Sequence, residues 1–376
     1  MHEIIEALIS LLISTASTPE AVILFAGDAM QHEAQLQAAI NSSKNHTDYD
    51  YSECFTDIER AIKKADYAVV NLEVPLGGAP YSGYPMFGAP DSYAKSLKDA
   101  GFDMFLTANN HTLDRRDTGL RRTIKVLDNL EVDHIGTYSS KAARDSILPL
   151  IKDIKGFNVG FLNYTYGTNG IKIKENTVVD YIDTALIARD IDAVRAKGAE
   201  IVTVALHWGI EYDLLPNKQQ KELAGFLTDK RVDMIIGGHP HVIQPMEMRL
   251  NKNGKKTFVV YSLGNFISNM KTDDTRGGAI ARVKLKRDTT GIAYVDTASY
   301  SLVFTIPPGD GSKNFRLVDA TERKAGSRQY NCNMFVSRAK SIFDKHNINV
   351  PFEKINRNHN GHNDERHDTP ATGDQQ

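Results

Sequence analysis

Residues 235–243 have the sequence IIGGHPHVI, in which a short apolar run ends at two glycines and two histidines follow, separated by a proline. The run has the length of a buried strand, and the glycines allow the backbone to turn at its end. Pro240 restricts its own backbone and that of His239, so the imidazoles of His239 and His241 can face one point. A single His-x-His pattern is a weak signal for a metal, because histidines also cap loops and pack in cores. The rest of the chain decides between these interpretations.

The same arrangement recurs at other predicted strands. Apolar runs that alternate with amphipathic segments predict a sheet of parallel strands with helices packed on it, and sites in such sheets gather at the carboxyl ends of strands. The predicted strands are 21–26, 67–72, 103–108, 200–206 and 232–237. The polar side chains at their ends are Asp28, Glu73, Asn110 with His111, His207, and His239 with His241. Five strand ends of this kind predict a metal site, because a buried strand usually ends in a generic turn.

The predicted ligands are Asp28, Glu73, Asn110, His207, His239 and His241. Imidazole nitrogens with carboxylate and amide oxygens suit one or two divalent ions of Mn, Zn or Fe, and Mg is compatible if water supplies much of the shell. Two adjacent ions could clamp an oxyanion and activate a bridging water. His111 could protonate a leaving group, or it could cap or orient its neighbours.

The composition excludes several classes of protein. Among 376 residues, 45 Lys and Arg nearly balance 47 Asp and Glu, so no global field attracts nucleic acid or an anionic membrane. Cys54 and Cys332 are far apart and show no metal or redox spacing. The chain has no run of about 18 apolar residues, the length that a transmembrane helix needs.

The chain divides into four predicted segments. Residues 1–20 are either a signal segment or an N-terminal helix: residues 7–14 resemble an apolar signal core, whereas His2, Glu3 and Glu6 stand where a signal carries Lys or Arg. The other segments are a main domain at 21–305, an extension at 306–350 and a disordered tail at 351–376. The tail is predicted to be disordered because it has almost no apolar residues.

Six motifs in this order resemble the CapA/PgsA capsule-synthesis family, which is similar to the calcineurin-like metallophosphoesterases. They are Gly27-Asp28, Asn71-Leu72-Glu73, ANNHTLD at 108–114, HWGIEY at 207–212, GHPH at 238–241 and YSLGNF at 261–266. The resemblance spans about residues 21–285. It implies a four-layer α/β/β/α sandwich, a part in capsule or poly-γ-glutamate production, and a location at the cell envelope or outside the cytoplasmic membrane. A cytoplasmic location is the alternative.

The resemblance also implies roles for individual residues. Asp28 and His241 would belong to one metal position, Asn110, His207 and His239 to the other, with Glu73 as the bridging carboxylate and His111 as the general acid. Two departures stand out. Met30 replaces a ligating histidine, and a thioether is a poor ligand for these ions; His32 could substitute for it or could cap the next segment. Asn71-Leu72-Glu73 also replaces the usual Gly-Asp-x-x-Asp.

Two functions follow. The first is a metal-dependent hydrolase or transferase of the CapA type that acts in capsule or poly-γ-glutamate synthesis, on a phosphoester or an anionic polymer. The second is a non-catalytic accessory protein that binds polymer or synthase partners, such as a capsule-synthase membrane complex. A nucleotide phosphodiesterase is a weaker third, and no nucleic-acid partner is expected.

Five further side chains have open roles. Arg115, with its neighbour Arg116, could meet an anionic substrate or be solvated. Trp208 could wall the site or pack in the core. Glu211 could orient a ligating histidine. Asn265 could contact substrate or form a turn.

Overall fold

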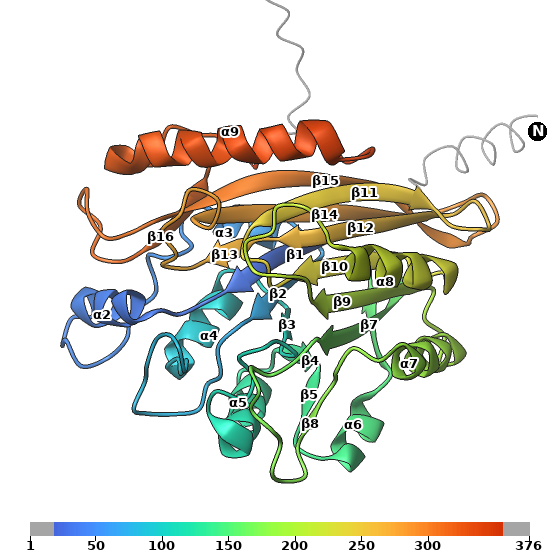
Figure 1. Cartoon of the computed structure of the whole chain (residues 1–376), viewed down its shortest axis with the longest axis horizontal. Coiled ribbons are helices and arrows are strands. Elements are labelled where there is room, and N and C mark those ends of the chain that lie inside the picture. Colours follow the sequence, from blue (N-terminus) through green and yellow to red (C-terminus); the bar gives the residue numbers. More distant parts are fainter. Residues whose placement is uncertain (1–18, 356–376) are drawn as a thin grey trace, which may run out of the picture.

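Two β-sheets packed face to face form the centre of the protein in a computed structural model that describes residues 19–355 (Figure 1). The strands of the first sheet are β1 (Glu20–Ala29), β2 (Tyr67–Leu72), β3 (Met104–Leu106), β4 (Asp133–Ile135), β13 (Asn265–Ile267), β14 (Gly277–Arg287), β15 (Ala293–Ile306) and β16 (Arg316–Asp319). They lie in the order β16-β15-β14-β1-β2-β3-β4, with β13 also paired to β1. The neighbours β1, β2, β3 and β4 are parallel, whereas β14, β15 and β16 are antiparallel.

The second sheet has six strands. They are β6 (Leu150–Ile154), β7 (Phe157–Thr165), β9 (Ile201–His207), β10 (Met234–Gly238), β11 (Ile243–Leu250) and β12 (Lys256–Leu263), in the order β11-β12-β10-β9-β7-β6. Its four inner strands are parallel, and β6 and β11 pair antiparallel at the two edges. A separate pair is formed by β5 (Thr137–Tyr138) and β8 (Val178–Val179).

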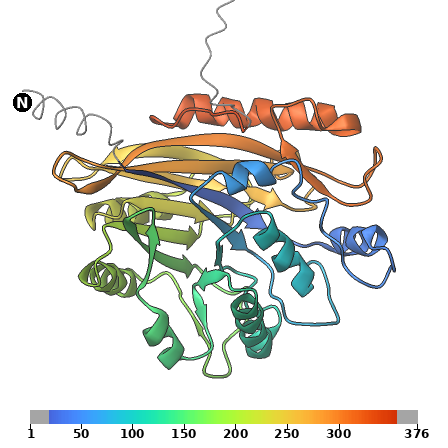
Figure 2. The same cartoon turned by 180° about the vertical axis from the view of Figure 1, so that it is seen from behind.

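Helices cover the outer face of each sheet. The helices of residues 19–355, including those that lie elsewhere, are α2 (Glu33–Ser42), α3 (Glu59–Lys63), α4 (Asp91–Asp99), α5 (Arg116–Asn129), α6 (Lys141–Ile147), α7 (Thr184–Ala196), α8 (Lys218–Asp229), the 3-10 turn η1 (Gly326–Arg328) and α9 (Gln329–His346). Apolar residues of α2, α3, α4 and α5 share one core with the outer face of the first sheet, and those of α7 and α8 share another with the second sheet. The view from behind shows α3 and α4 in front of the first sheet (Figure 2). The four-layer α/β/β/α prediction is therefore confirmed.

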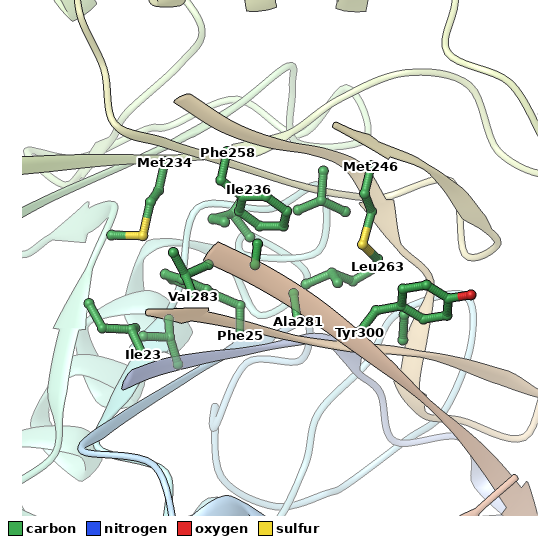
Figure 3. Close-up of a cluster of buried hydrophobic side chains, with 14 of the residues drawn as sticks. Ile23, Phe25, Met234, Ile236, Met246, Phe258, Leu263, Ala281, Val283 and Tyr300 are labelled. Atoms are coloured by element: carbon green, nitrogen blue, oxygen red, sulfur yellow. The ribbon is translucent and has the colours of Figure 1, made fainter. Parts of the chain in front are cut away.

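The largest apolar cluster fills the space between the two sheets. Figure 3 shows Ile23 and Phe25 of the first sheet meeting Met234, Ile236 and Phe258 of the second. On β1, residues 21, 23 and 25 face this core, while residues 24 and 26 face the helices. A strand that is buried on both faces is a continuous apolar run, which is why the sequence pattern locates β1.

The C-terminal part of the described chain closes one edge of the sandwich. Helix α9 lies beside β11 and β15 (Figure 1), and its buried residues Cys332, Phe335, Ala339 and Phe343 join the core between the sheets. Their spacing of three or four residues places them on one stripe of the helix. The extension predicted at 306–350 thus supplies β16 and α9.

The prediction of a disordered tail at 351–376 needs correction. Residues 351–355 of the predicted disordered tail lie along β15, where the amide of Tyr300 donates to the carbonyl of Pro351. The remainder of that tail, and the signal or helix expected at the N-terminus up to residue 18, lie outside the described residues.

Candidate metal centre

The carboxyl ends of four parallel strands meet at one point between the sheets. Asp28 near the end of β1 is in register with Asn71 of β2, and Gly238 of β10 is in register with His207 of β9. A close approach of backbones makes this possible, because a Cβ at Gly27 would lie 2.0 Å from the carbonyl oxygen of Gly264. Strand-end residues from both sheets therefore share one buried site.

All six predicted ligands lie in this site. Nε2 of His207 is 2.8 Å from Oδ1 of Asn110 and 3.4 Å from Oε1 of Glu73. Nε2 of His241 is 3.7 Å from the same Glu73 oxygen, and Nδ1 of His241 is 3.3 Å from Oδ2 of Asp28. Ligand atoms held about 2.1 Å from one ion are separated by roughly 3–3.5 Å. The 3.4 Å between His207 and Glu73 lies in that range, and the 2.8 Å to Asn110 and the 3.7 Å from Nε2 of His241 lie just outside it.

Two groups of potential ligands share one carboxylate. Asp28, Glu73 and His207 form one group, and Glu73, His239 and His241 form the other, with the ligand atoms in each group within 4.8 Å of one another. The shared member, Glu73, agrees with the bridging role that the family resemblance implies. The remaining division differs from the implied one, because Asp28 groups with His207, and His239 groups with His241.

Unsatisfied polar atoms show that these residues fit a cation. Oε1 of Glu73 and Nδ1 of His239 are buried and have no hydrogen-bond partner among the described residues. Leaving such atoms unpaired costs about 1–3 kcal/mol each, a cost that coordination would remove. The backbone is also strained here, with φ of 97° at His239 and 56° at His241, and strain of this kind clusters at ligand-binding sites.

In the absence of a metal, burial and neighbouring charges give the site residues different protonation states. Burial lowers the pKa of His207 to about 3, and burial likewise lowers that of His239, so both imidazoles are neutral at pH 7. Burial alone would lower the pKa of His241, but the carboxylates of Glu73 and Asp28 raise it to about 9. Burial raises the pKa of Glu73 well above its usual range, and the charge of Asp28 adds to this. For Asp28, the hydrogen bond and charge of His241 outweigh burial and lower the pKa.

Amide side chains hold the ligands from behind, and the sequence analysis did not predict this layer. Nδ2 of Asn71 donates to Oδ1 of Asp28 at 2.7 Å and to Oε2 of Glu73 at 3.3 Å. Oδ1 of Asn265 lies 3.0 Å from Nδ1 of His241 and can only accept, so that nitrogen carries a proton and Nε2 is left to act as the ligand. Asn265 thus has a role that neither of its two predicted ones describes, since it contacts a predicted ligand.

His111 is held by a carboxylate. Its Nδ1 lies 2.8 Å from Oδ2 of Asp114, and both side chains are buried. The same Asp114 oxygen accepts from the amide of Phe87, whose ring packs edge-on against His111 with the ring centroids 4.6 Å apart. Asp114 therefore places the imidazole proton on Nδ1, which leaves Nε2 to exchange a proton.

The loop after β7 forms part of the mouth of the site, as its polar and aromatic content suggests. Asn169 accepts from Nδ2 of Asn110 at 3.2 Å. Tyr166 is 48% exposed, and its ring centroid lies 4.6 Å from that of His239. The tyrosine is thus the exposed neighbour of a buried ligand.

The missing histidine is not replaced. Met30 is 2% exposed and packs in the core under the helices, where it cannot serve as a ligand. His32 precedes α2 and exchanges hydrogen bonds with Gln35, while its Nδ1 accepts from the amide of Asn269. Of the two roles open to His32, the structure therefore has the capping one.

Two neighbouring arginines have different surroundings. The guanidinium of Arg115 is not simply solvated, because it donates to the carbonyls of Phe87 and Pro80 and to the hydroxyl of Ser82. It fixes the loop over residues 77–90. Arg116 is exposed.

Trp208 has the packing role, since its indole donates to the carbonyl of Tyr261 and stacks on that ring. Glu211 is exposed, and none of the hydrogen bonds recorded for residues 19–355 joins it to a histidine.

The fold and the site define the class of protein: an α/β/β/α sandwich with a buried cluster of imidazoles and carboxylates that can hold a divalent cation. The chain belongs to the family of bacterial capsule synthesis proteins, PGA_cap, whose model matches residues 22–270.

Curated relatives support this membership. The PGA biosynthesis protein CapA of Bacillus subtilis (strain 168) is 35% identical over 246 residues, which cover 63% of this chain and 62% of that protein. The capsule biosynthesis protein CapA of Bacillus anthracis is 28% identical over 260 residues, which cover 66% and 61%. Each match thus spans less than two thirds of the relative's length.

Solved structures with a similar arrangement include nucleotidases. The NAD nucleotidase of Haemophilus influenzae gives a TM-score of 0.47 at 14% identity, covering 88% of this chain and 68% of that one. The 5'-nucleotidase of Candida albicans gives a TM-score of 0.42 at 10% identity, covering 87% of this chain and 59% of that one.

Within residues 19–355, no helix has both the length and the apolar character that crossing a membrane requires.

Proposed function

We propose that this protein is a metal-dependent hydrolase or transferase that acts in capsule or poly-γ-glutamate synthesis at the cell envelope. The observation that carries the proposal is the shared Glu73, whose unpaired oxygen lies between Nε2 of His207 and Nε2 of His241. An orphaned carboxylate between two imidazoles is costly in a folded protein unless a cation joins them.

The donor set favours Mn, Zn or Fe over Mg, because three of the six candidate ligands are imidazoles. The two groups that share Glu73 favour two ions. A bound ion of this kind would act as a Lewis acid toward a phosphoryl or acyl oxygen and make water a better nucleophile at neutral pH.

The side chains around the centre have distinct tasks in this reaction. Asp114 keeps the proton on Nδ1 of His111, so a protonated His111 releases its other proton, from Nε2, to the leaving oxygen or nitrogen. Asn71 and Asn265 hold the ligands Asp28 and His241 in place.

We infer that the substrate is an anionic polymer or a phosphoester. The names of the curated relatives favour the polymer, since one is called a PGA biosynthesis protein and the other a capsule biosynthesis protein. A capsule-synthase complex in the membrane is the partner we propose.

Metal content per chain, measured on untagged protein purified without chelator, tests the proposal. We expect up to two equivalents in the wild type and a loss of metal in His239→Ala and Asp28→Ala. His346→Ala, at the end of α9 and away from the centre, should match the wild type. If the wild type neither retains nor takes up Mn, Zn or Fe, the metal-dependent function is refuted.

A specific observation favours the alternative of a non-catalytic accessory protein. Met30 is committed to the core and His32 to a helix cap, so the ligand that the resemblance expects after Asp28 is missing. Metal-loaded protein separates the two functions. An enzyme should turn over phosphoesters or polyglutamate and lose that activity in Asp114→Asn. An accessory protein should show no turnover, and the wild type and Asp114→Asn should bind polymer equally well.

A further inference from the structure

A second cavity lies on the outer face of the first sheet, at the opposite end of β1 from the metal centre. It is bounded by α3, by β1, β14 and β15, and by residues 351–355, and its volume is about 480 Å³. Pockets for small ligands have volumes of roughly 300–1,000 Å³. Val22 in its wall precedes Asp28 by six residues on β1, which corresponds to roughly 20 Å along an extended strand.

The alternation of side chains explains why this end of the sheet is polar. Nearer the metal centre, the outer face carries apolar residues such as Leu24 and Ile280, which α2 to α4 cover. Farther along the same face, β14 presents Arg282 and Lys284, and β15 presents Thr297 and Ser299. At this end of the sheet, the short helix α3 lines the cavity. The cavity therefore lies where the layer of helices is thinnest (Figure 2).

Positive charge dominates the wall. The cationic residues are Lys64, Arg282, Lys284 and Lys354, and the carboxylates are Glu20 and Glu353. Lys284 pairs with Glu20 at 3.3 Å. Lys64, Arg282 and Lys354 form no ion pair among residues 19–355, since no carboxylate oxygen of these residues lies within 4.0 Å of their charged nitrogens. The carboxylates of Glu353 and Asp319 attract the charge of Arg282 from beyond this distance, so the surrounding chain balances the cations of the cavity only in part.

Arg282 is the central cation. It is partly buried, and the one hydrogen bond of its side chain among the described residues joins Nη1 to the hydroxyl of Ser301 at 2.7 Å. A guanidinium has five N–H donors, so most of its donors have no protein partner. Burial lowers the pKa of Arg282, in keeping with a charge that is poorly solvated. A partly buried cation that no carboxylate contacts is stabilised when an anion reaches it.

We propose that this cavity binds a small anion that carries at least two negative charges on carboxylate or phosphate groups, with Arg282 as its main contact. The fork of the guanidinium matches both groups. Lys64 and Lys354 supply the remaining positive charge. The site is separate from the metal centre, so the proposal holds whether or not the protein is a hydrolase.

Calorimetric titration at low ionic strength tests this proposal, with inorganic phosphate and citrate as the two probes. The full chain carrying His239→Ala is used so that anions do not report on the metal centre. We expect binding of at least one probe, weakened about tenfold or more by Arg282→Gln because a charge-assisted contact is lost. Arg189→Gln, which changes an exposed arginine on α7, should bind as tightly as the parent.

The two probes distinguish the sources of the anion, because preference for phosphate or for citrate identifies the group that the cavity selects. Lys64→Glu provides a second variant in case Arg282→Gln fails to fold. Lys64 is exposed directly after α3, and reversing its charge should also weaken binding. The absence of binding by both probes, or binding that neither Arg282→Gln nor Lys64→Glu weakens, would overturn the proposal.

Discussion

Replacing Glu73 by Gln should have opposite effects on stability and on metal binding. The carboxylate is fully buried, one of its oxygens has no partner among the described residues, and burial together with the charge of Asp28 raises its pKa. Without a metal, the negative charge of Glu73 therefore destabilises the folded protein. With a metal it is the ligand that joins both groups.

The expected size follows from the burial and the pKa. An unpaired buried polar atom costs about 1–3 kcal/mol, and each unit by which the folded pKa exceeds the unfolded pKa costs about 1.4 kcal/mol once the carboxyl ionises. Because the pKa of Glu73 is raised on folding, its contribution to stability is largest in acid and is lost as the pH rises toward the folded pKa. Metal-free Glu73→Gln should thus be about 1–3 kcal/mol more stable than the wild type at pH 7.5, with little difference near pH 4.

The assay is urea unfolding in the presence of chelator at both pH values, followed by metal titration at pH 7.5. Loss of a residue that only hydrogen-bonds to a metal ligand weakens metal binding about 10–100-fold. Loss of the shared ligand Glu73 should therefore weaken metal binding here about 100-fold or more. Glu211→Gln is the matched control, since that carboxylate is exposed and should change stability by less than about 0.5 kcal/mol. The reasoning fails if Glu73→Gln is less stable than the wild type in chelator, because Glu73 would then be a structural ion-pair partner.

Three other outcomes follow from the site. Arg115→Ala should lower the unfolding free energy by about 1–3 kcal/mol in thermal melts, because three hydrogen bonds to the 77–90 loop are lost. Arg189→Ala is the control and should leave the unfolding free energy unchanged. If the two variants melt alike, Arg115 does not hold the loop. Asp114→Asn should retain its metal yet lower turnover by about 10²–10⁴, the usual contribution of a general acid whose tautomer is now wrong. Metal binding at pH 7.5 should release at least one proton, since the pKa of His241 is about 9 and the ion replaces its proton. The apparent affinity should therefore rise with pH up to about 9, and calorimetry in buffers of different ionisation enthalpy measures the released proton.

The fold was predictable where burial leaves a simple pattern. Strands β1, β2, β9, β10 and β12 are apolar runs because both of their faces are covered, and the pattern locates each to within a few residues. Strand β11 follows His-Pro-His directly, and Pro245 within it argues against a strand; its place at the edge of the sheet is what tolerates the proline. Helix α9 buries one stripe between polar residues, so the sequence alone does not reveal that it closes the core.

The site divides in the same way. The six candidate ligands lie at strand ends, and strand ends are visible in the sequence. The residues that position them are not, because their contacts join distant segments: Asn71 donates to Asp28 across 43 positions and Asn265 meets His241 across 24. The sequence does not distinguish Arg115 from its neighbour Arg116. Only the position of the 77–90 loop decides that Arg115 holds the loop and that Arg116 is exposed.

The division of ligands between the two sheets also bears on mechanism. Asp28 and Glu73 come from the first sheet, whereas His207 and the His-Pro-His histidines follow strands of the second. The apolar core between the sheets is continuous without the site, so the strands bring the ligands together before any ion is bound. Metal binding then need not fold the protein, in contrast to small zinc domains. Under the proposed function, the free energy of coordination would relieve the unpaired atoms of Glu73 and His239, and a catalytic centre would require such preorganisation.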